Sequence, residues 1–279
     1  MGHVEDLELL GMQLAQEYAR LDGVEGFVIG GSVARGFADE DSDLEAYVYH
    51  DGAVPPVAVI ERIVKHVGAH PTRSVNLHWT HPAWGTHSFF GTETLLVELG
   101  YRNVDETRQR IEAYLDGSIS VRDGIHDVAF GWYPSGLAAC LAECHPLYDP
   151  RGNLNELKVL AQQFPARLRD SLLEYHVNEA EGILAQKLVH AHKRGDVFHF
   201  QAALARVVRS CVVGIFTVNN VHFPGDKWNR RYLESMHYVP PGFVRDQHLL
   251  LSLRVLVPRE RATALEVIAK WTQWLRSMW

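Results

Sequence analysis

Near the start of the chain, hydrophobic residues recur every three or four positions, as on one face of a helix: Val4, Leu7, Leu10, Leu14, Tyr18 and Leu21. Residues 3–21 are therefore predicted to form an amphipathic helix, and Asp22-Gly23 is predicted to end it. Two short apolar runs follow, Glu25 to Ile29 and Leu44 to Tyr49. Each has the length of a buried strand.

Helices and strands are predicted to alternate up to about residue 150. After Pro55-Pro56, a helix is indicated by the spacing of Val57, Ile60, Ile63, Val64 and Val67. The alternation of Val75, Leu77 and Trp79 with polar residues is typical of a strand. Residues 80–92, rich in turn formers and aromatic residues, are predicted to be a loop. A strand from Thr94 to Tyr101 and a helix over residues 104–116 come next.

A change of pattern follows the turn sequence LYDPRGN, near residue 150. Long helical periodicity covers residues 154–162, 166–194, 197–220 and 259–278. We therefore expect an α/β (α+β) domain with a mixed sheet at residues 1–150. An all-α helical-bundle domain is expected at residues 151–279.

Composition narrows the classes of protein that fit. The chain has 279 residues, of which 47% are hydrophobic and 22% charged, so a sizeable core is expected. A net charge of −7 argues against long nucleic acid as a partner. Three cysteines are too few for a disulfide framework, and we find neither a signal peptide nor an apolar run of about 18 residues. We expect a cytoplasmic monomer or homodimer with no membrane partner.

Gly30-Gly31-Ser32 follows a predicted strand and precedes a predicted short helix, Val33 to Phe37. Glycine allows the backbone to approach a ligand closely, and a helix N-terminus offers free N–H groups to an anion. A simple strand-to-helix turn would explain the same residues. The sequence matches neither a Walker loop nor a dinucleotide-binding fingerprint.

Asp43 and Glu45 stand two residues apart where the second strand begins. Because side chains alternate along a strand, both carboxylates are expected on one face. Such a pair repels unless a cation lies between its members, and oxygen ligands suit Mg²⁺. A solvated turn, in which Asp and Ser are ordinary residues, is the alternative.

Together the two features form the pattern G-G-S-x-A-R-G-x(6)-D-x-E, which resembles the signature of the DNA polymerase beta-like nucleotidyltransferase superfamily. An α/β domain before a helical bundle is similar in outline to the antibiotic nucleotidyltransferases that modify aminoglycosides and lincosamides. It is equally similar to uncharacterised bacterial relatives. The resemblance implies a nucleotidyltransferase domain at residues 1–150, with Gly30, Gly31 and Ser32 holding nucleotide phosphates. It also implies two Mg²⁺ ions on Asp43 and Glu45.

The superfamily uses a third carboxylate from a later strand, as metal ligand or as general base. Glu98, in the apolar run TLLVELGY, is the best candidate, with Glu93 and Asp105 as substitutes. The alternative is that Glu98 faces solvent or pairs with an arginine such as Arg102. Basic residues must also meet the triphosphate, and we expect this of Arg35, Lys187 and Lys227.

Other sites are less consistent with the sequence. The aromatic residues Trp79, Trp84, Phe89 and Phe90 could line an acceptor pocket or belong to the core. Cys140, Cys144 and His145 lack the second pair of ligands that a zinc site needs. A serine hydrolase elbow around Ser32 would lie too early in the chain and would leave Asp43 and Glu45 unexplained.

The sequence thus predicts a Mg²⁺-dependent nucleotidyltransferase that moves a nucleoside monophosphate, expected to be AMP from ATP, to a hydroxyl acceptor. The acceptor could be a small molecule such as an antibiotic. The alternative is a nucleotidyltransferase-like antitoxin, regulator or nucleotide sensor without transfer activity.

Overall fold

The computed structural model describes residues 2–71, 77–81, 85–120, 123–124, 133–227 and 229–279. Two compact units make up the chain: Met1–Ala113 with Leu137–Gln163, and Tyr114–Gly136 with Phe164–Trp279. The division falls within two helices, α4 (Val104–Leu115) and α5 (Pro134–Glu143). The expected domains, 1–150 and 151–279, stay a prediction.

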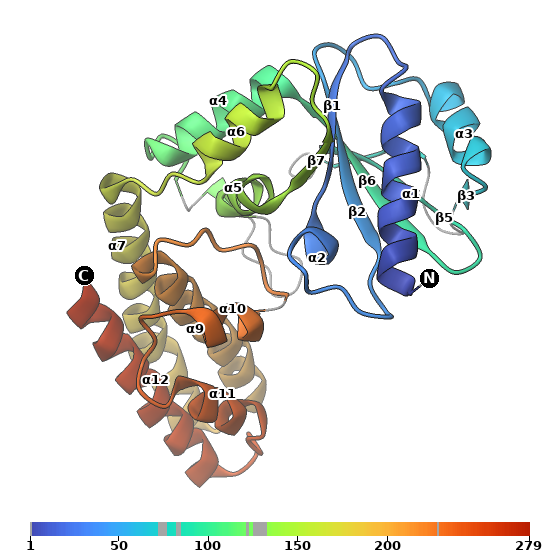
Figure 1. Cartoon of the computed structure of the whole chain (residues 1–279). Coiled ribbons are helices and arrows are strands. Elements are labelled where there is room, and N and C mark those ends of the chain that lie inside the picture. Colours follow the sequence, from blue (N-terminus) through green and yellow to red (C-terminus); the bar gives the residue numbers. More distant parts are fainter. Residues whose placement is uncertain (1, 72–76, 82–84, 121–122, 125–132, 228) are drawn as a thin grey trace. The chain divides into compact units, whose positions relative to one another are not determined.

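The first unit contains the sheet (Figure 1). Its strands are β1 (Val24–Ile29), β2 (Leu44–His50), β3 (His70–Pro71), β4 (Trp79–His81), β5 (Gly85–Gly91), β6 (Leu96–Asn103) and β7 (His145–Tyr148). Its remaining helices are α1 (His3–Tyr18), α2 (Gly31–Ala34), α3 (Val57–His66) and α6 (Asn153–Ala161). Within the described residues the sheet has seven strands in the order β3-β5-β6-β2-β1-β7, and β4 pairs with β5.

The sheet is mixed, because β2 and β6 run parallel while the other pairs are antiparallel. The residues that alternate along β2 belong to two environments. Leu44, Ala46 and Val48 lie in the hydrophobic core, so Glu45 and Tyr47 are on the opposite face. The parallel pair thus has one apolar face and one face that carries polar groups.

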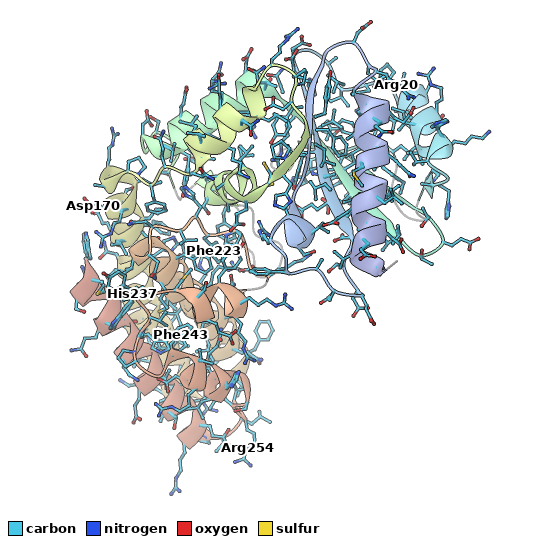
Figure 2. All side chains as sticks on the ribbon, viewed as in Figure 1. Arg20, Asp170, Phe223, His237, Phe243 and Arg254 are labelled. Atoms are coloured by element: carbon cyan, nitrogen blue, oxygen red, sulfur yellow. The ribbon has the colours of Figure 1, made fainter. Side chains whose placement is uncertain are left out.

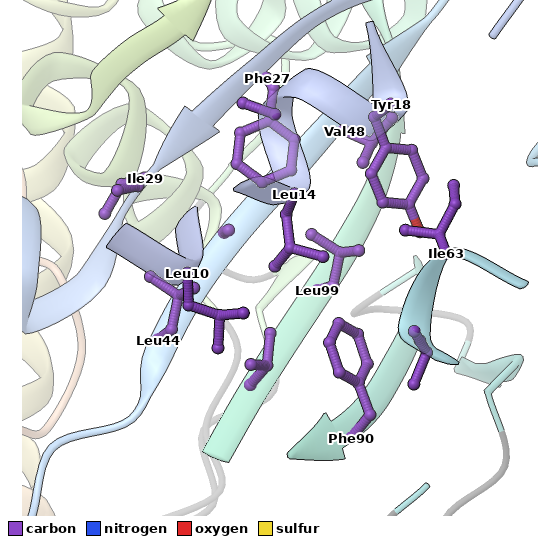
Figure 3. Close-up of a cluster of buried hydrophobic side chains, with 14 of the residues drawn as sticks. Leu10, Leu14, Tyr18, Phe27, Ile29, Leu44, Val48, Ile63, Phe90 and Leu99 are labelled. Atoms are coloured by element: carbon purple, nitrogen blue, oxygen red, sulfur yellow. The ribbon is translucent and has the colours of Figure 1, made fainter. Parts of the chain in front are cut away.

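The helices α1 and α3 cover the apolar face. Leu7, Leu10 and Leu14 of α1 are buried in one stripe, as their spacing predicts. Figure 3 shows Leu10 and Leu14 directed at the strands, close to Leu44 and Leu99. The helix α1 ends at Tyr18, and the chain then turns into β1.

A chain of hydroxyl groups is buried in this otherwise apolar core. The Tyr18 hydroxyl lies 2.9 Å from that of Tyr101, which in turn lies 3.0 Å from Ser88 Oγ. Ser88 also donates a hydrogen bond to the carbonyl of Leu77. Each hydroxyl therefore has a partner, which offsets the cost of removing it from water.

The second unit is helical. It contains α7 (Ala166–Ile183), a π-helical turn η2 (Leu184–Leu188), α8 (Val189–Arg194), α9 (Val197–Val218), α10 (Asn229–Ser235), α11 (Phe243–Leu251) and α12 (Pro258–Met278). Phe223 and Phe243 are almost completely buried in it, whereas Arg254 is exposed (Figure 2). This mixed α/β sheet and helical C-terminal region confirm the predicted fold class.

Among the described residues, α9 is the one helix long and apolar enough to cross a membrane, and 72% of its apolar window is buried inside the protein. Its central residues, among them Val207, Cys211 and Ile215, are fully buried. This helix does not stand out in the sequence as an apolar run of about 18 residues, because Arg206 and Arg209 interrupt the run. A helix buried in the core of a helical unit has the same apolar composition, and the burial of α9 fits this position.

Most predicted elements are confirmed within a few residues, but the loop predicted at 80–92 is wrong. Residues 79–81 and 85–91 form β4 and β5. The polar residues that suggested a loop have partners in the sheet: Thr86 bonds to Thr80, and Ser88 to Tyr101. Of the strand predicted at residues 75–79, residues 75 and 76 lie outside the described residues, Leu77 and His78 form a turn, and Trp79 begins β4. The sequence did not indicate α5, β7, α10 or α11.

Candidate functional site

The glycine turn joins β1 to the short helix α2, beside the start of β2. The Gly30 N–H donates a hydrogen bond of 2.8 Å to the Glu45 carbonyl. Gly31 has a φ of +59°, in the left-handed region that favours glycine. A Cβ at this position would lie 2.5 Å from Glu45 Oε2. The turn and the predicted metal ligand are therefore packed directly against each other.

The three predicted carboxylates come from adjacent parts of the sheet. Asp43 immediately precedes β2, and Glu45 is its second residue. Glu45 is paired in register with Glu98 of the parallel strand β6. In-register residues of neighbouring strands project from the same face, so the Glu45 and Glu98 side chains share the polar face. All three residues are partly exposed.

Tyr47 bonds one oxygen of the Glu45 carboxylate. Its hydroxyl donates a hydrogen bond to Glu45 Oε1. Burial raises the pKa of Tyr47 well above its usual value, and nearby Cys140 and Glu45 act in the same direction. The hydroxyl therefore keeps its proton at neutral pH and remains a donor.

A histidine and an arginine complete this face. His87 of β5 is buried, with Nε2 3.7 Å from Glu98 Oε1. Burial, reinforced by the Arg102 guanidinium, lowers the pKa of His87 to about 4, so the ring is neutral at pH 7. Arg102 Cζ lies 3.6 Å from the centroid of the Tyr47 ring, and Nη1 donates to Tyr49 Oη at 3.2 Å. The neutral His87 ring thus lies beside Glu98, while Arg102, the arginine suggested as a partner of Glu98, contacts Tyr47 and Tyr49.

Two aromatic residues lie on the same face of the sheet as Glu98. Phe89 is paired in register with Glu98, and its ring centroid lies 6.0 Å from that of Trp79 in an edge-on contact. Phe90, in contrast, is fully buried in the core. The aromatic residues predicted for a pocket thus divide between the two faces, and Trp84 lies outside the described residues.

The predicted basic residues lie in different parts of the chain. Arg35, at the end of α2, donates through Nε to Glu143 Oε2 at 2.6 Å. Lys187 is exposed in η2, and Lys227 is exposed in the second unit. The phosphate contacts expected of these three residues, and of Ser32, stay predictions.

The donor set suits Mg²⁺, because carboxylate oxygens are its preferred protein ligands. The packing of Gly31 against Glu45 also leaves no side chain between the turn and this carboxylate. Among the described residues, however, no three His, Cys, Asp or Glu side chains form a ready group that could hold a metal ion. Metal binding would therefore require at least one of these carboxylates to move closer to the others.

Sequence reasoning missed Tyr47 and His87, and it named Arg102 only as a partner for Glu98. Alternation along the strands could have identified two of the three, since Tyr47 follows Glu45 by two residues and Arg102 follows Glu98 by four. His87 was hidden in the segment predicted to be a loop.

Comparisons with known proteins give a family match over part of the chain and a similar solved structure. A domain family of unknown function, DUF4037, matches residues 132–229, less than half of the chain and outside the glycine turn and the carboxylates. No curated protein matches the sequence. The solved structure of a nucleotidyltransferase-like protein from Exiguobacterium sibiricum is similar to this chain, with 13% identity and a TM-score of 0.45. The similarity covers 94% of this chain and 75% of that one.

Proposed function

We propose that the protein is a Mg²⁺-dependent nucleotidyltransferase that moves a nucleoside monophosphate, AMP from ATP, to a hydroxyl acceptor. The observation that carries this proposal is the in-register pairing of Glu45 with Glu98, beside the glycine turn that packs on Glu45. A carboxylate face next to a left-handed glycine turn combines groups for a metal and for phosphates. A solvated turn would not account for the contact between Gly31 and the Glu45 carboxylate.

The roles of the residues follow from their chemistry. Asp43 and Glu45 would hold the metal, which would neutralise the triphosphate charge when bound, and Glu98 would either complete the metal site or act as the base. The backbone of Gly30 and Gly31 and the hydroxyl of Ser32 would hold the phosphates. Arg35, Lys187 and Lys227 are proposed to supply further positive charge.

The reaction forms one bond and breaks one bond at the α-phosphorus. The acceptor hydroxyl oxygen attacks the α-phosphorus, and the bond to the oxygen that bridges the α- and β-phosphates breaks. Pyrophosphate leaves with the electron pair of that bond. Glu98 is the proposed base that takes the proton of the hydroxyl.

The acceptor is proposed to be a small molecule with an apolar part as well as a hydroxyl group. Trp79 and Phe89 present aromatic rings beside Glu98, and aromatic side chains commonly line small-molecule sites. An antibiotic is one molecule of this kind.

Transfer from labelled nucleoside triphosphates tests the proposal. The full chain would be incubated with Mg²⁺ and a panel of aminoglycosides, lincosamides, proteins and tRNA, beside the Asp43→Asn variant. We expect Mg²⁺-dependent labelling of a small-molecule acceptor that Asp43→Asn abolishes. Full activity of Asp43→Asn would contradict the metal site. ATP binding without transfer to any acceptor would favour the regulator or sensor.

A further inference from the structure

We infer that Tyr47 is a positioning residue, which fixes the Glu45 carboxylate for metal binding while Gly100 and Arg102 hold its ring. This inference rests on the proposed function, because it takes Glu45 to be a metal ligand. Tyr47 follows Glu45 by two residues on β2, so the two side chains share the polar face of the sheet.

The two oxygens of the Glu45 carboxylate have different surroundings. Oε1 accepts the hydrogen bond of the Tyr47 hydroxyl. Oε2 faces the glycine turn, where a Cβ on Gly31 would lie 2.5 Å away. Tyr47 thus holds one oxygen and leaves the other toward the turn proposed to hold phosphates. Partners that hold metal ligands in this way commonly orient them and raise metal affinity.

The Tyr47 ring is itself fixed by its neighbours. Its partner in register on β6 is Gly100, and a Cβ there would lie 2.6 Å from Tyr47 Cδ1. Because Gly100 has no side chain, the Tyr47 ring can lie against β6 at this position. The guanidinium of Arg102, 3.6 Å from the ring centroid, covers the ring in a cation–π contact.

Tyr49 provides a matched comparison. It is two residues further along β2, fully buried, on the same face, and its hydroxyl accepts a hydrogen bond from Arg102. Removal of either hydroxyl therefore takes away one partly buried hydrogen bond. Only the Tyr47 hydroxyl bonds to a proposed metal ligand. A purely structural role would make the two tyrosines equivalent.

Direct binding of Mn²⁺, a paramagnetic substitute for Mg²⁺, tests the inference without an acceptor or nucleotide. Electron paramagnetic resonance would measure the affinity of the full chain and of the variants Tyr47→Phe, Tyr49→Phe, Gly100→Ala and Asp43→Asn. We expect Tyr47→Phe to weaken Mn²⁺ binding about 10- to 100-fold, and Tyr49→Phe to change it less than about twofold. Gly100→Ala keeps the Tyr47 hydroxyl but displaces the ring, so it should weaken binding as well.

The outcomes separate this inference from the proposed function. Wild-type binding that is lost in Asp43→Asn but unchanged in Tyr47→Phe would overturn the role of Tyr47 and leave the metal site standing. Equal weakening in Tyr47→Phe and Tyr49→Phe would also overturn it. No Mn²⁺ binding by the wild-type chain would overturn the metal site and the inference with it. If Tyr47→Phe does not fold, Gly100→Ala provides the test instead. A Mn²⁺ affinity of Gly100→Ala equal to that of the wild type would then refute the inference.

Discussion

Glu45 and Glu98 lie directly opposite each other on the parallel strands β2 and β6. Two carboxylates on the same face repel each other, unless a cation or a proton lies between them. Glu45 accepts a hydrogen bond from the Tyr47 hydroxyl, and Glu98 Oε1 lies 3.7 Å from Nε2 of the His87 ring. The proposed cation site therefore rests on the register that brings Glu45 and Glu98 together.

Replacement of Glu98 by glutamine tests its role as base. Glutamine keeps the shape of the side chain but cannot take the acceptor proton. We expect nucleotidyl transfer to an identified acceptor to fall by about 100- to 10,000-fold. The matched control is Glu93→Gln, an exposed glutamate before the same strand, which should change the rate less than about twofold. Equal rates for Glu98→Gln and the wild type would assign the base elsewhere.

Alanine variants at two glycines distinguish the effect of backbone strain from the effect of a collision with the Glu45 carboxylate. Gly31 and Gly36 both have left-handed φ values, +59° and +67°, so alanine at either should cost about 1–2 kcal/mol of stability. A Cβ at Gly36 has no neighbour within 4 Å, whereas one at Gly31 collides with Glu45. We expect only Gly31→Ala to weaken Mg²⁺-dependent ATP binding, by at least about tenfold. Comparable losses of binding in both variants would show that strain alone is responsible.

Local pattern was enough to predict the strands that carry Glu45 and Glu98, because each strand is an apolar run interrupted by an acidic residue. Glu98 is suggested as a site residue by the superfamily resemblance, and the roles of Asp43, Glu45 and Glu98 stay predictions. The register that puts Glu45 opposite Glu98 could not be predicted, since it depends on pairing between segments more than 50 residues apart. Likewise, β5 was missed because its hydroxyl groups find their partners on neighbouring strands, as Ser88 does with Tyr101.

The buried hydroxyl chain is expected to contribute to stability. In Tyr101→Phe, the Tyr18 hydroxyl loses its partner while it stays fully buried. We expect the free energy of unfolding to fall by about 1–3 kcal/mol in chemical denaturation. Tyr148→Phe is the control, because the hydroxyl of Tyr148 has no hydrogen bond among the described residues. A loss in Tyr101→Phe no greater than in Tyr148→Phe would show that the chain is unimportant.

His87 should make stability fall in weak acid. The pKa of His87 is about 4 in the folded protein and about 6.5 in the unfolded chain. Between these values the unfolded chain binds more protons, so the free energy of unfolding decreases as the pH falls from 6.5 to 4. The decrease from His87 should reach about 3 kcal/mol at pH 4.

Denaturation curves of the wild type and His87→Phe, recorded in EDTA from pH 7 to pH 4, measure this contribution. The difference between the two proteins should change with pH over this window, because phenylalanine keeps a ring but does not titrate. A difference that stays constant with pH would show that His87 is protonated as readily in the folded protein as in the unfolded chain.

The site residues that sequence did not suggest act through contacts between strands. Tyr47 is buried against Gly100 and below Arg102, and nothing in the order of residues along β2 reveals this neighbourhood. In the helical unit, Arg209 makes a paired contact with Asp226, the residue before Lys227. This contact links segments 17 residues apart and was also beyond prediction from spacing.

We propose that Asp43 and Glu45 bind a metal together with the phosphates of a nucleotide. Isothermal titration of the full chain with ATP measures such binding, and it needs no acceptor. We expect ATP binding in the presence of Mg²⁺, with loss of binding in EDTA and in Asp43→Asn. No binding of ATP at millimolar concentration, or binding that is the same with EDTA and in Asp43→Asn, would contradict it.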